Sequence, residues 1–166
     1  MNDKPETPMS IVPAETRADI EVARSLFLEY AASLGFDLGF QGFDDELSDL
    51  PGDYALPRGR LFLAVTGGGA AGCVALRELD ADTCEMKRLY VRPAFRGKGV
   101  GRALAQRAIE EARSIGYRKM RLDAIESMRE AVALYRSLGF VEIAPYRFNP
   151  VQGALFLEMS LSGGQK

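Results

Sequence analysis

The chain has no histidine and only two cysteines among its 166 residues. Zinc sites in proteins are built mainly from histidine and cysteine ligands, so this composition argues against a bound metal. The two cysteines, Cys73 and Cys84, fall in neighbouring segments that we predict to be strands. If these strands form a hairpin that turns near residues 80–83, Cys84 lies close to the turn and Cys73 far from it. We therefore expect two small core residues and no disulfide.

Long hydrophobic runs are also missing from the sequence. No stretch approaches the roughly 20 apolar residues that a bilayer-spanning helix requires, and the N-terminus lacks the pattern of a signal peptide. No basic run with interleaved aromatic residues occurs, which argues against a nucleic-acid partner. We expect a cytoplasmic protein that binds neither a membrane nor nucleic acid.

The residues that are present have an ordinary globular composition, 47% hydrophobic and 27% charged. At this length we expect one domain over residues 10–162, after a polar, disordered tail over residues 1–9. The net charge of −2 conceals an asymmetry, because residues 1–60 carry 12 acidic and 5 basic side chains and residues 61–166 carry 11 and 16. The acidic half either attracts a cationic substrate or is ordinary solvated surface.

The spacing of apolar residues predicts an alternation of strands and helices. Strands are predicted at residues 10–14, 61–66, 72–79, 84–91, 119–124, 140–143 and 154–161. Helices are predicted at residues 16–34, 44–50, 101–115 and 127–138. The first strand is predicted at a sheet edge, because Pro13 cannot donate to a ladder. The last helix is predicted to begin with Ser127 as N-cap and Glu130 as its capping-box partner.

A glycine-rich hexapeptide joins the strand at 84–91 to the helix at 101–115, and its residues are Arg96, Gly97, Lys98, Gly99, Val100 and Gly101. Three glycines in five residues remove side chains where backbone must approach a ligand closely or take a positive φ. The helix that follows offers unpaired N–H groups, which suit phosphate oxygens, and Lys98 and Arg102 supply neutralising charge. This stretch is predicted to bind a pyrophosphate.

Two better-known phosphate motifs do not fit the spacing. A P-loop requires Gly-x-x-x-x-Gly-Lys-Ser/Thr, and a dinucleotide fingerprint requires Gly-x-Gly-x-x-Gly/Ala. Neither motif matches this sequence. In the dinucleotide fingerprint, Arg102 or Leu104 would stand at the last position, where glycine or alanine is required. What remains is Arg-x-x-Gly-x-Gly, carried by Arg96, Gly99 and Gly101, after a strand and before a helix.

That pattern resembles the acyl-CoA-binding motif of the GCN5-related N-acetyltransferases. A second block resembles the family too, because residues 131–140 match its helix ending in Leu-Tyr-x-x-x-Gly-Phe, with Tyr135 as the tyrosine. The resemblance covers roughly residues 60–161. It implies an α/β fold, with a mixed, mainly antiparallel sheet of six or seven strands and helices on both faces. It also implies acetyl transfer from acetyl-CoA to a primary amine of a small molecule or peptide, by direct attack.

The resemblance assigns roles to particular residues. In the family the fourth and fifth strands splay apart and the pantetheine arm inserts between them, so Leu89, Tyr90 and Val91 would bind its amides and the thioester. The backbone of residues 96–102 would hold the pyrophosphate. Tyr135 matches the general acid, or it is a half-buried packing residue. The base would be Glu85, ranked first, or Asp123, and either is otherwise a plain carboxylate.

Other properties stay open at this stage. Many family members carry asparagine where this chain has Met128, so that cofactor contact is lost or replaced by Ser127. The acidic segment 37–53 favours a cationic acceptor, whereas Arg88 and Arg147 favour a carboxylate of an amino acid. A non-catalytic acyl-CoA-binding module, an O-acyltransferase and a longer acyl chain are alternatives, and the exposed sheet ends leave a homodimer open.

Overall fold

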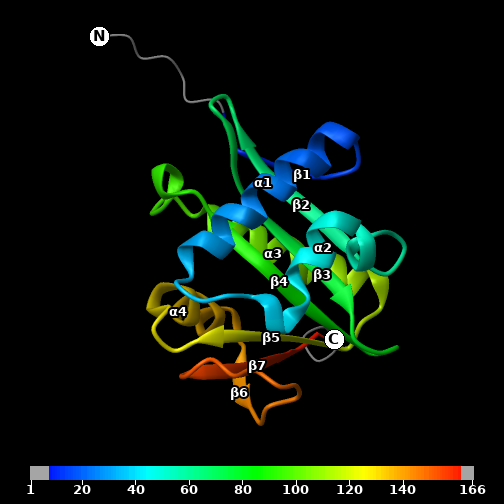
Figure 1. Ribbon diagram of the computed structural model, residues 1–166. Coiled ribbons are helices and arrows are strands. Elements are labelled where there is room, and N and C mark those ends of the chain that lie inside the picture. Colours follow the sequence, from blue (N-terminus) through cyan, green and yellow to red (C-terminus); the bar gives the residue numbers. More distant parts are fainter. Residues whose placement is uncertain (1–7, 162–166) are drawn as a thin grey trace.

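The computed structural model describes residues 8–161, and it shows one sheet with helices packed against both of its faces (Figure 1). Of the tail expected at residues 1–9, all but the last two residues lie outside this range. The strands are β1 (Ser10–Pro13), β2 (Arg60–Thr66), β3 (Gly69–Glu78), β4 (Thr83–Val91), β5 (Lys119–Ile125), β6 (Val141–Ile143) and β7 (Ala154–Ser160). The α-helices are α1 (Arg17–Ser33), α2 (Phe43–Asp49), α3 (Val100–Ile115) and α4 (Arg129–Leu138). Short 3₁₀ turns occupy Gly39–Gln41, Gly52–Tyr54 and Pro93–Phe95.

The seven strands lie in the order β1-β2-β3-β4-β5-β7-β6. Every neighbouring pair is antiparallel except β4 and β5, which run parallel because α3 connects them as a crossover. The predicted fold class is therefore confirmed. β1 forms one edge of the sheet, so Pro13 lies where its missing N–H costs no internal ladder bond, as predicted.

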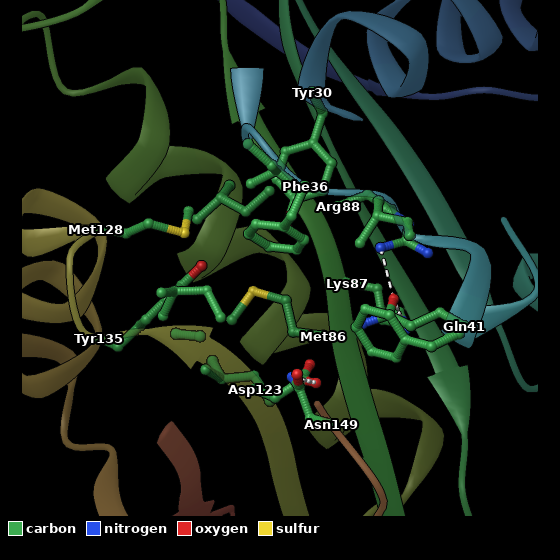
Figure 2. Close-up of a pocket in the computed structure, with 17 residues that line it drawn as sticks. Tyr30, Phe36, Gln41, Met86, Lys87, Arg88, Asp123, Met128, Tyr135 and Asn149 are labelled. Carbon is green, nitrogen blue, oxygen red and sulfur yellow. Dashed lines mark hydrogen bonds between the residues drawn. The ribbon is translucent and has the colours of Figure 1, made fainter. Parts of the chain in front are cut away.

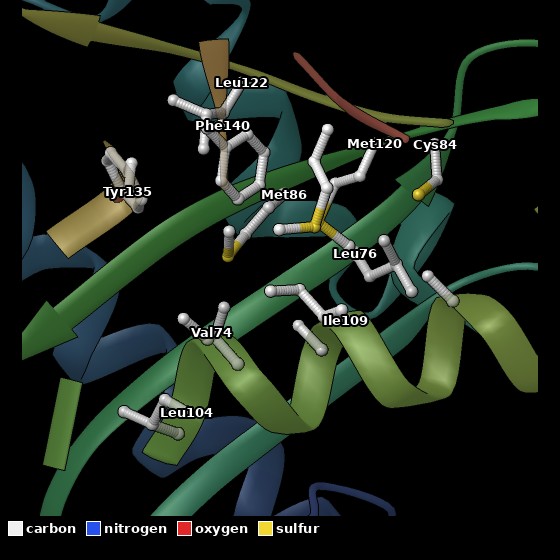
Figure 3. Close-up of a cluster of buried hydrophobic side chains, with 14 of the residues drawn as sticks. Val74, Leu76, Cys84, Met86, Leu104, Ile109, Met120, Leu122, Tyr135 and Phe140 are labelled. Carbon is white, nitrogen blue, oxygen red and sulfur yellow. The ribbon is translucent and has the colours of Figure 1, made fainter. Parts of the chain in front are cut away.

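Two hydrophobic cores lie on opposite faces of the sheet, because side chains alternate along each strand. On β2, Leu61 and Leu63 join the core under α1 and α2, whereas Phe62 and Ala64 join the core under α3 and α4. The second core is drawn in Figure 3, where the apolar face of α3 packs against side chains from the central strands. No helix between residues 8 and 161 combines the length and apolar character that a bilayer crossing requires.

The helix starts illustrate where local signals hold and where they fail. Thr16 caps α1, and its hydroxyl and the Asp19 carboxylate form a reciprocal capping box. The predicted cap of α4 is wrong, because the helix begins two residues after Ser127 and Met128 occupies the N-cap without a side-chain bond. A turn at residues 125–128, closed by a 2.8 Å bond from the Met128 N–H to the Ile125 carbonyl, places Ser127 before the helix.

Candidate active site

The central feature of the site is a gap between β4 and β5. The two strands pair only at their first residues, where Thr83, Cys84 and Glu85 lie opposite Lys119, Met120 and Arg121. β4 then continues to Val91 and β5 to Ile125 without pairing to each other. The edge of β4 that faces β5 therefore carries backbone N–H and C=O groups with no strand partner in residues 8–161, ready to bind an extended ligand.

β4 carries a β-bulge at Arg88, within the part of the strand that does not pair with β5. Tyr90 pairs with Cys73 and Lys87 with Ala75, so β4 has one residue more than β3 between these pairs. Arg88 has a φ of +60°, which is uncommon for a residue with a side chain. A bulge bends its strand and increases the local twist, and this one lies three residues beyond Glu85, the last residue of β4 that pairs with β5.

The side chain of Arg88 holds the bulge in place. Its Nε and Nη2 atoms each donate to the Glu46 carboxylate at 2.9 Å, and its Nη1 donates to the Gln41 amide oxygen at 2.9 Å. Such bidentate guanidinium–carboxylate pairs are among the strongest polar contacts in proteins. The connection between α1 and β2 is thereby fixed against the bulge.

An outer groove of about 600 Å³ runs from this gap over the glycine turn, between β4 and the start of α4. Gly97 and Gly99 adopt positive φ angles of +78° and +80°, and in the described part of the chain no heavy atom beyond their neighbours in sequence lies within 4 Å of a Cβ built on either residue. Gly99 is the N-cap of α3 and no side chain caps the helix, so its first N–H groups are free for an anion. The turn therefore leaves space and N–H donors for an anion, and its binding of a pyrophosphate stays a prediction.

The basic residues of the turn have different surroundings. Arg96 lines the groove, and its Nε donates to the Val91 carbonyl at 3.0 Å, which ties the turn to the end of β4. Lys98 and Arg102 do not line it, although Lys98 is exposed beside it. The Arg102 guanidinium instead donates to the Ser137 hydroxyl of α4 at 2.8 Å.

A smaller inner cavity, of about 40 Å³, lies deeper between the strands. Figure 2 shows side chains entering it from β4, β5, α4 and the segment between α1 and α2. The inner cavity and the outer groove share the lining residues Tyr30, Leu34, Phe36, Leu89, Ile125 and Met128. The two spaces therefore adjoin at the point where β4 and β5 diverge.

Tyr135 lines the inner cavity from α4. The residue is buried, and its ring packs edge-on against Phe140 with centroids 5.8 Å apart. Burial raises the pKa of its hydroxyl well above the ordinary value, and the nearby Tyr30 and Asp123 add to the rise. The hydroxyl therefore keeps its proton at neutral pH and can act as a donor.

The two candidate bases occupy different places. Asp123 lines the inner cavity from β5, and one of its oxygens accepts a hydrogen bond from the Asn149 amide at 3.0 Å. Glu85 is fully buried and lines neither space. Its carboxylate accepts from the Arg77 Nε at 2.9 Å and the Tyr146 hydroxyl at 2.6 Å, and it pairs with Arg147.

Sequence reasoning missed several residues of the site. Lys87 lines the inner cavity from β4, next to the bulge. Tyr146 and Asn149 come from the connection between β6 and β7, and their side chains bond to Glu85 and Asp123 respectively. The sequence signal was a pair of adjacent basic residues, Lys87 and Arg88, inside a predicted buried strand, where a buried charge requires a partner or a function.

The sheet, the gap between β4 and β5 and the glycine turn match the arrangement that the resemblance to acetyltransferases predicts. The family model described as acetyltransferase (GNAT) family matches residues 25–140. An uncharacterized N-acetyltransferase of Schizosaccharomyces pombe is 36% identical over 156 residues, which cover 93% of this chain and 96% of that protein. This chain belongs to the acetyltransferase (GNAT) family.

Solved structures agree with this fold. A GNAT-family acetyltransferase of Staphylococcus aureus superposes with a TM-score of 0.77 at 20% identity, covering 93% of this chain and 99% of that one. The structure of YncA from Salmonella typhimurium, determined with its cofactor acetyl-CoA, superposes with a TM-score of 0.69 at 22% identity, covering 93% and 95%. At these identities the likeness concerns the fold.

Proposed function

We propose that this protein transfers an acetyl group from acetyl-CoA to the primary amine of a small molecule or peptide, by direct attack in a ternary complex. The observation that carries the proposal is the continuity of the two spaces. A groove over a glycine turn meets an inner cavity at the gap between β4 and β5, and a protonated tyrosine lines that cavity. YncA, which shares this fold, binds acetyl-CoA.

The residues present fit acetyl-CoA. The N–H groups at the start of α3 and the open glycines at 97 and 99 would hold its diphosphate. The free edge of β4 at Leu89, Tyr90 and Val91 would bind the pantetheine amides as an added strand. A Cβ on Gly101 would stand 3.6 Å from Val91 and 3.7 Å from Leu134, so the helix start packs closely on both walls.

When bound, acetyl-CoA supplies an acyl group activated as a thioester. An N–H of the β4 edge, directed at the carbonyl oxygen, would stabilise the negative charge that develops there during attack. The Tyr135 hydroxyl would give its proton to the departing sulfur, so that coenzyme A leaves as the free thiol and the tyrosinate takes up a proton again afterwards. The lining of Tyr30, Phe36 and Met128 would limit the access of water.

A base must take the proton that the attacking amine loses. We place Asp123 ahead of Glu85 in this role, because Asp123 lines the inner cavity and Glu85 lines neither space. The hydrogen bond from Asn149 would orient the Asp123 carboxylate. Glu85, with both oxygens occupied by Arg77, Arg147 and Tyr146, would instead fix the loop after β6.

Direct attack is favoured over an acyl-enzyme because neither cysteine lies in position to react. Cys73 and Cys84 are fully buried and line neither the groove nor the inner cavity. Burial raises the pKa of both thiols, that of Cys84 to about 12, so the reactive thiolate is scarce at neutral pH.

The test is a screen of amine acceptors with acetyl-CoA, read by mass detection of the acetylated product. We expect Tyr135→Phe to lower turnover at least about 100-fold while the Kd for acetyl-CoA is unchanged, since only proton donation is lost. Tyr117→Phe is the matched control, because Tyr117 is buried and its hydroxyl donates to the Arg58 carbonyl outside both spaces. Binding of acetyl-CoA without any acetylated product would instead indicate a non-catalytic acyl-CoA-binding module.

A further inference from the structure

Lys87 occupies an unusual position for a lysine. It is only 6% exposed, it comes from β4 beside the bulge, and it lines the inner cavity. Lysine is almost never buried unless it is paired, because taking an ammonium group out of water is costly. A partner or a function is therefore expected for this side chain.

The pairing of Lys87 inside the protein is weak. Its Nζ donates to the Gln41 amide oxygen at 3.0 Å, and that uncharged oxygen also accepts from Arg88. Among residues 8–161, the one carboxylate within 4.0 Å is Glu85, at 3.8 Å, beyond hydrogen-bond distance. Glu85 is already bonded to Arg77 and paired with Arg147.

An ammonium group has three donors, and one of those on Lys87 is used by a direct hydrogen bond. Burial, together with the neighbouring Arg88 and Arg77, lowers the pKa of Lys87 to about 7. The positive charge at this place is therefore poorly compensated. An anion that entered the inner cavity would balance this charge and accept hydrogen bonds from the remaining N–H groups of Lys87.

The opposite wall of the cavity carries the complementary group. Asp123 on β5 faces the space that Lys87 lines from β4, on the two sides of the gap between the strands (Figure 2). The chamber is small, with a volume of about 40 Å³, which favours a compact ligand. A cavity with one anionic and one cationic wall suits a molecule that holds an amine and a carboxylate a few bonds apart.

We propose that the acceptor is an amine bearing a carboxylate, such as an amino acid, and that Lys87 binds this carboxylate while Asp123 faces the amine. The proposal rests on the proposed function and specifies its substrate class. It differs from an assignment of the carboxylate to Arg88 or Arg147, because those guanidinium groups are already paired with Glu46 and Glu85. Of Lys87 and Arg88, the two basic residues between positions 8 and 161 that line the inner cavity, Lys87 is the one without a hydrogen-bonded carboxylate.

The experiment compares acceptors in pairs, each amino acid against its own carboxamide, with acetyl-CoA held saturating. The wild-type protein is expected to favour the acid over the amide in kcat/KM by about 10- to 100-fold, which corresponds to a hydrogen bond between charged groups. In Lys87→Met the ratio should fall toward one, mainly through a higher KM for the acid. The Kd for acetyl-CoA should not change.

Lys119→Met is the matched control, because Lys119 also lies in a central strand but is exposed and lines neither space. It should keep the wild-type ratio. Equal loss of turnover for acids and amides in Lys87→Met would overturn the proposal, since it would indicate a structural or proton-transfer role.

The acid-to-amide ratio of the wild-type protein remains decisive even if Lys87→Met does not fold. Amines acetylated without regard to a carboxylate would refute the carboxylate site and leave acetyl transfer intact. Acetyl-CoA binding with no acetylated product from any acceptor would remove both proposals.

Discussion

Gly99 and Gly116 stand at opposite ends of α3 and offer a matched pair of substitutions. Both have a left-handed backbone, with φ of +80° and +109°, and no heavy atom lies within 4 Å of a Cβ built on either residue. Alanine at either position therefore introduces backbone strain without a collision, at a cost of about 1–2 kcal/mol. For a chain of this size we expect each variant to lose roughly 2–8 °C in Tm.

The two positions differ in their relation to the outer groove. Gly99 lines the groove, so a methyl group there occupies space that the diphosphate of acetyl-CoA would need, whereas Gly116 lies outside it. We expect Gly99→Ala to raise the Kd for acetyl-CoA at least about 10-fold, equivalent to about 1.4 kcal/mol. Gly116→Ala should leave the Kd unchanged.

Calorimetric titration with acetyl-CoA gives the two Kd values, and thermal unfolding followed by circular dichroism gives the two Tm values. A similar fall in Tm for both variants would confirm that the strain is matched. The reasoning is refuted if both variants lose affinity equally, or if Gly99→Ala binds acetyl-CoA as the wild-type protein does.

Three further predictions concern buried polar groups. Glu46→Gln should lower the free energy of unfolding by about 2–4 kcal/mol, because it breaks a bidentate pair with the buried Arg88. Glu21→Gln is the control, since it removes an exposed pair and should cost under about 1 kcal/mol. Equal costs for the two variants in urea unfolding would contradict this prediction. Lys87 has its pKa lowered by burial to about 7, so the folded state binds fewer protons than the unfolded state between about pH 7 and about pH 10. The contribution of Lys87 to stability therefore rises with pH across that window by up to about 1.4 kcal/mol per pH unit. The difference in unfolding free energy between the wild-type protein and Lys87→Met should show this dependence on pH, and a difference that is independent of pH would contradict it. Both cysteines are buried, with the pKa of Cys84 raised to about 12, so a thiol reagent should react only as the protein unfolds, and rapid labelling of the native state would disprove this.

Much of the fold could be predicted because its signals are local. Glycine and aspartate turns separate the apolar runs, and these turns and runs together predict all seven strands and four α-helices close to their observed bounds. The start of α4 could not be placed in this way. Ser127 and Glu130 satisfy a capping pattern in the sequence. In the structure, however, the Glu126 N–H donates to the Gly153 carbonyl, residues 125–128 form a turn, and the helix begins only at Arg129.

The residues of the site likewise fall into those predictable from local sequence and those that depend on contacts distant in sequence. The glycine turn is a continuous segment whose function depends on its own backbone, so its residues were recognisable in the sequence. The bulge at Arg88 was not, because its positive φ is accompanied by contacts to Gln41 and Glu46, more than forty residues away. Asn149 was missed for the same reason, since it reaches Asp123 from a loop of unremarkable composition.

The central claim is that free amides at the start of α3 hold the diphosphate of coenzyme A. The most direct measurement is calorimetric titration of the purified protein with coenzyme A and, separately, with pantetheine, which lacks the diphosphate and the phosphoadenosine attached to it. We predict that coenzyme A binds at least about 100-fold more tightly, equivalent to about 2.7 kcal/mol. Equal affinity for the two ligands, or no heat with coenzyme A, would contradict the claim.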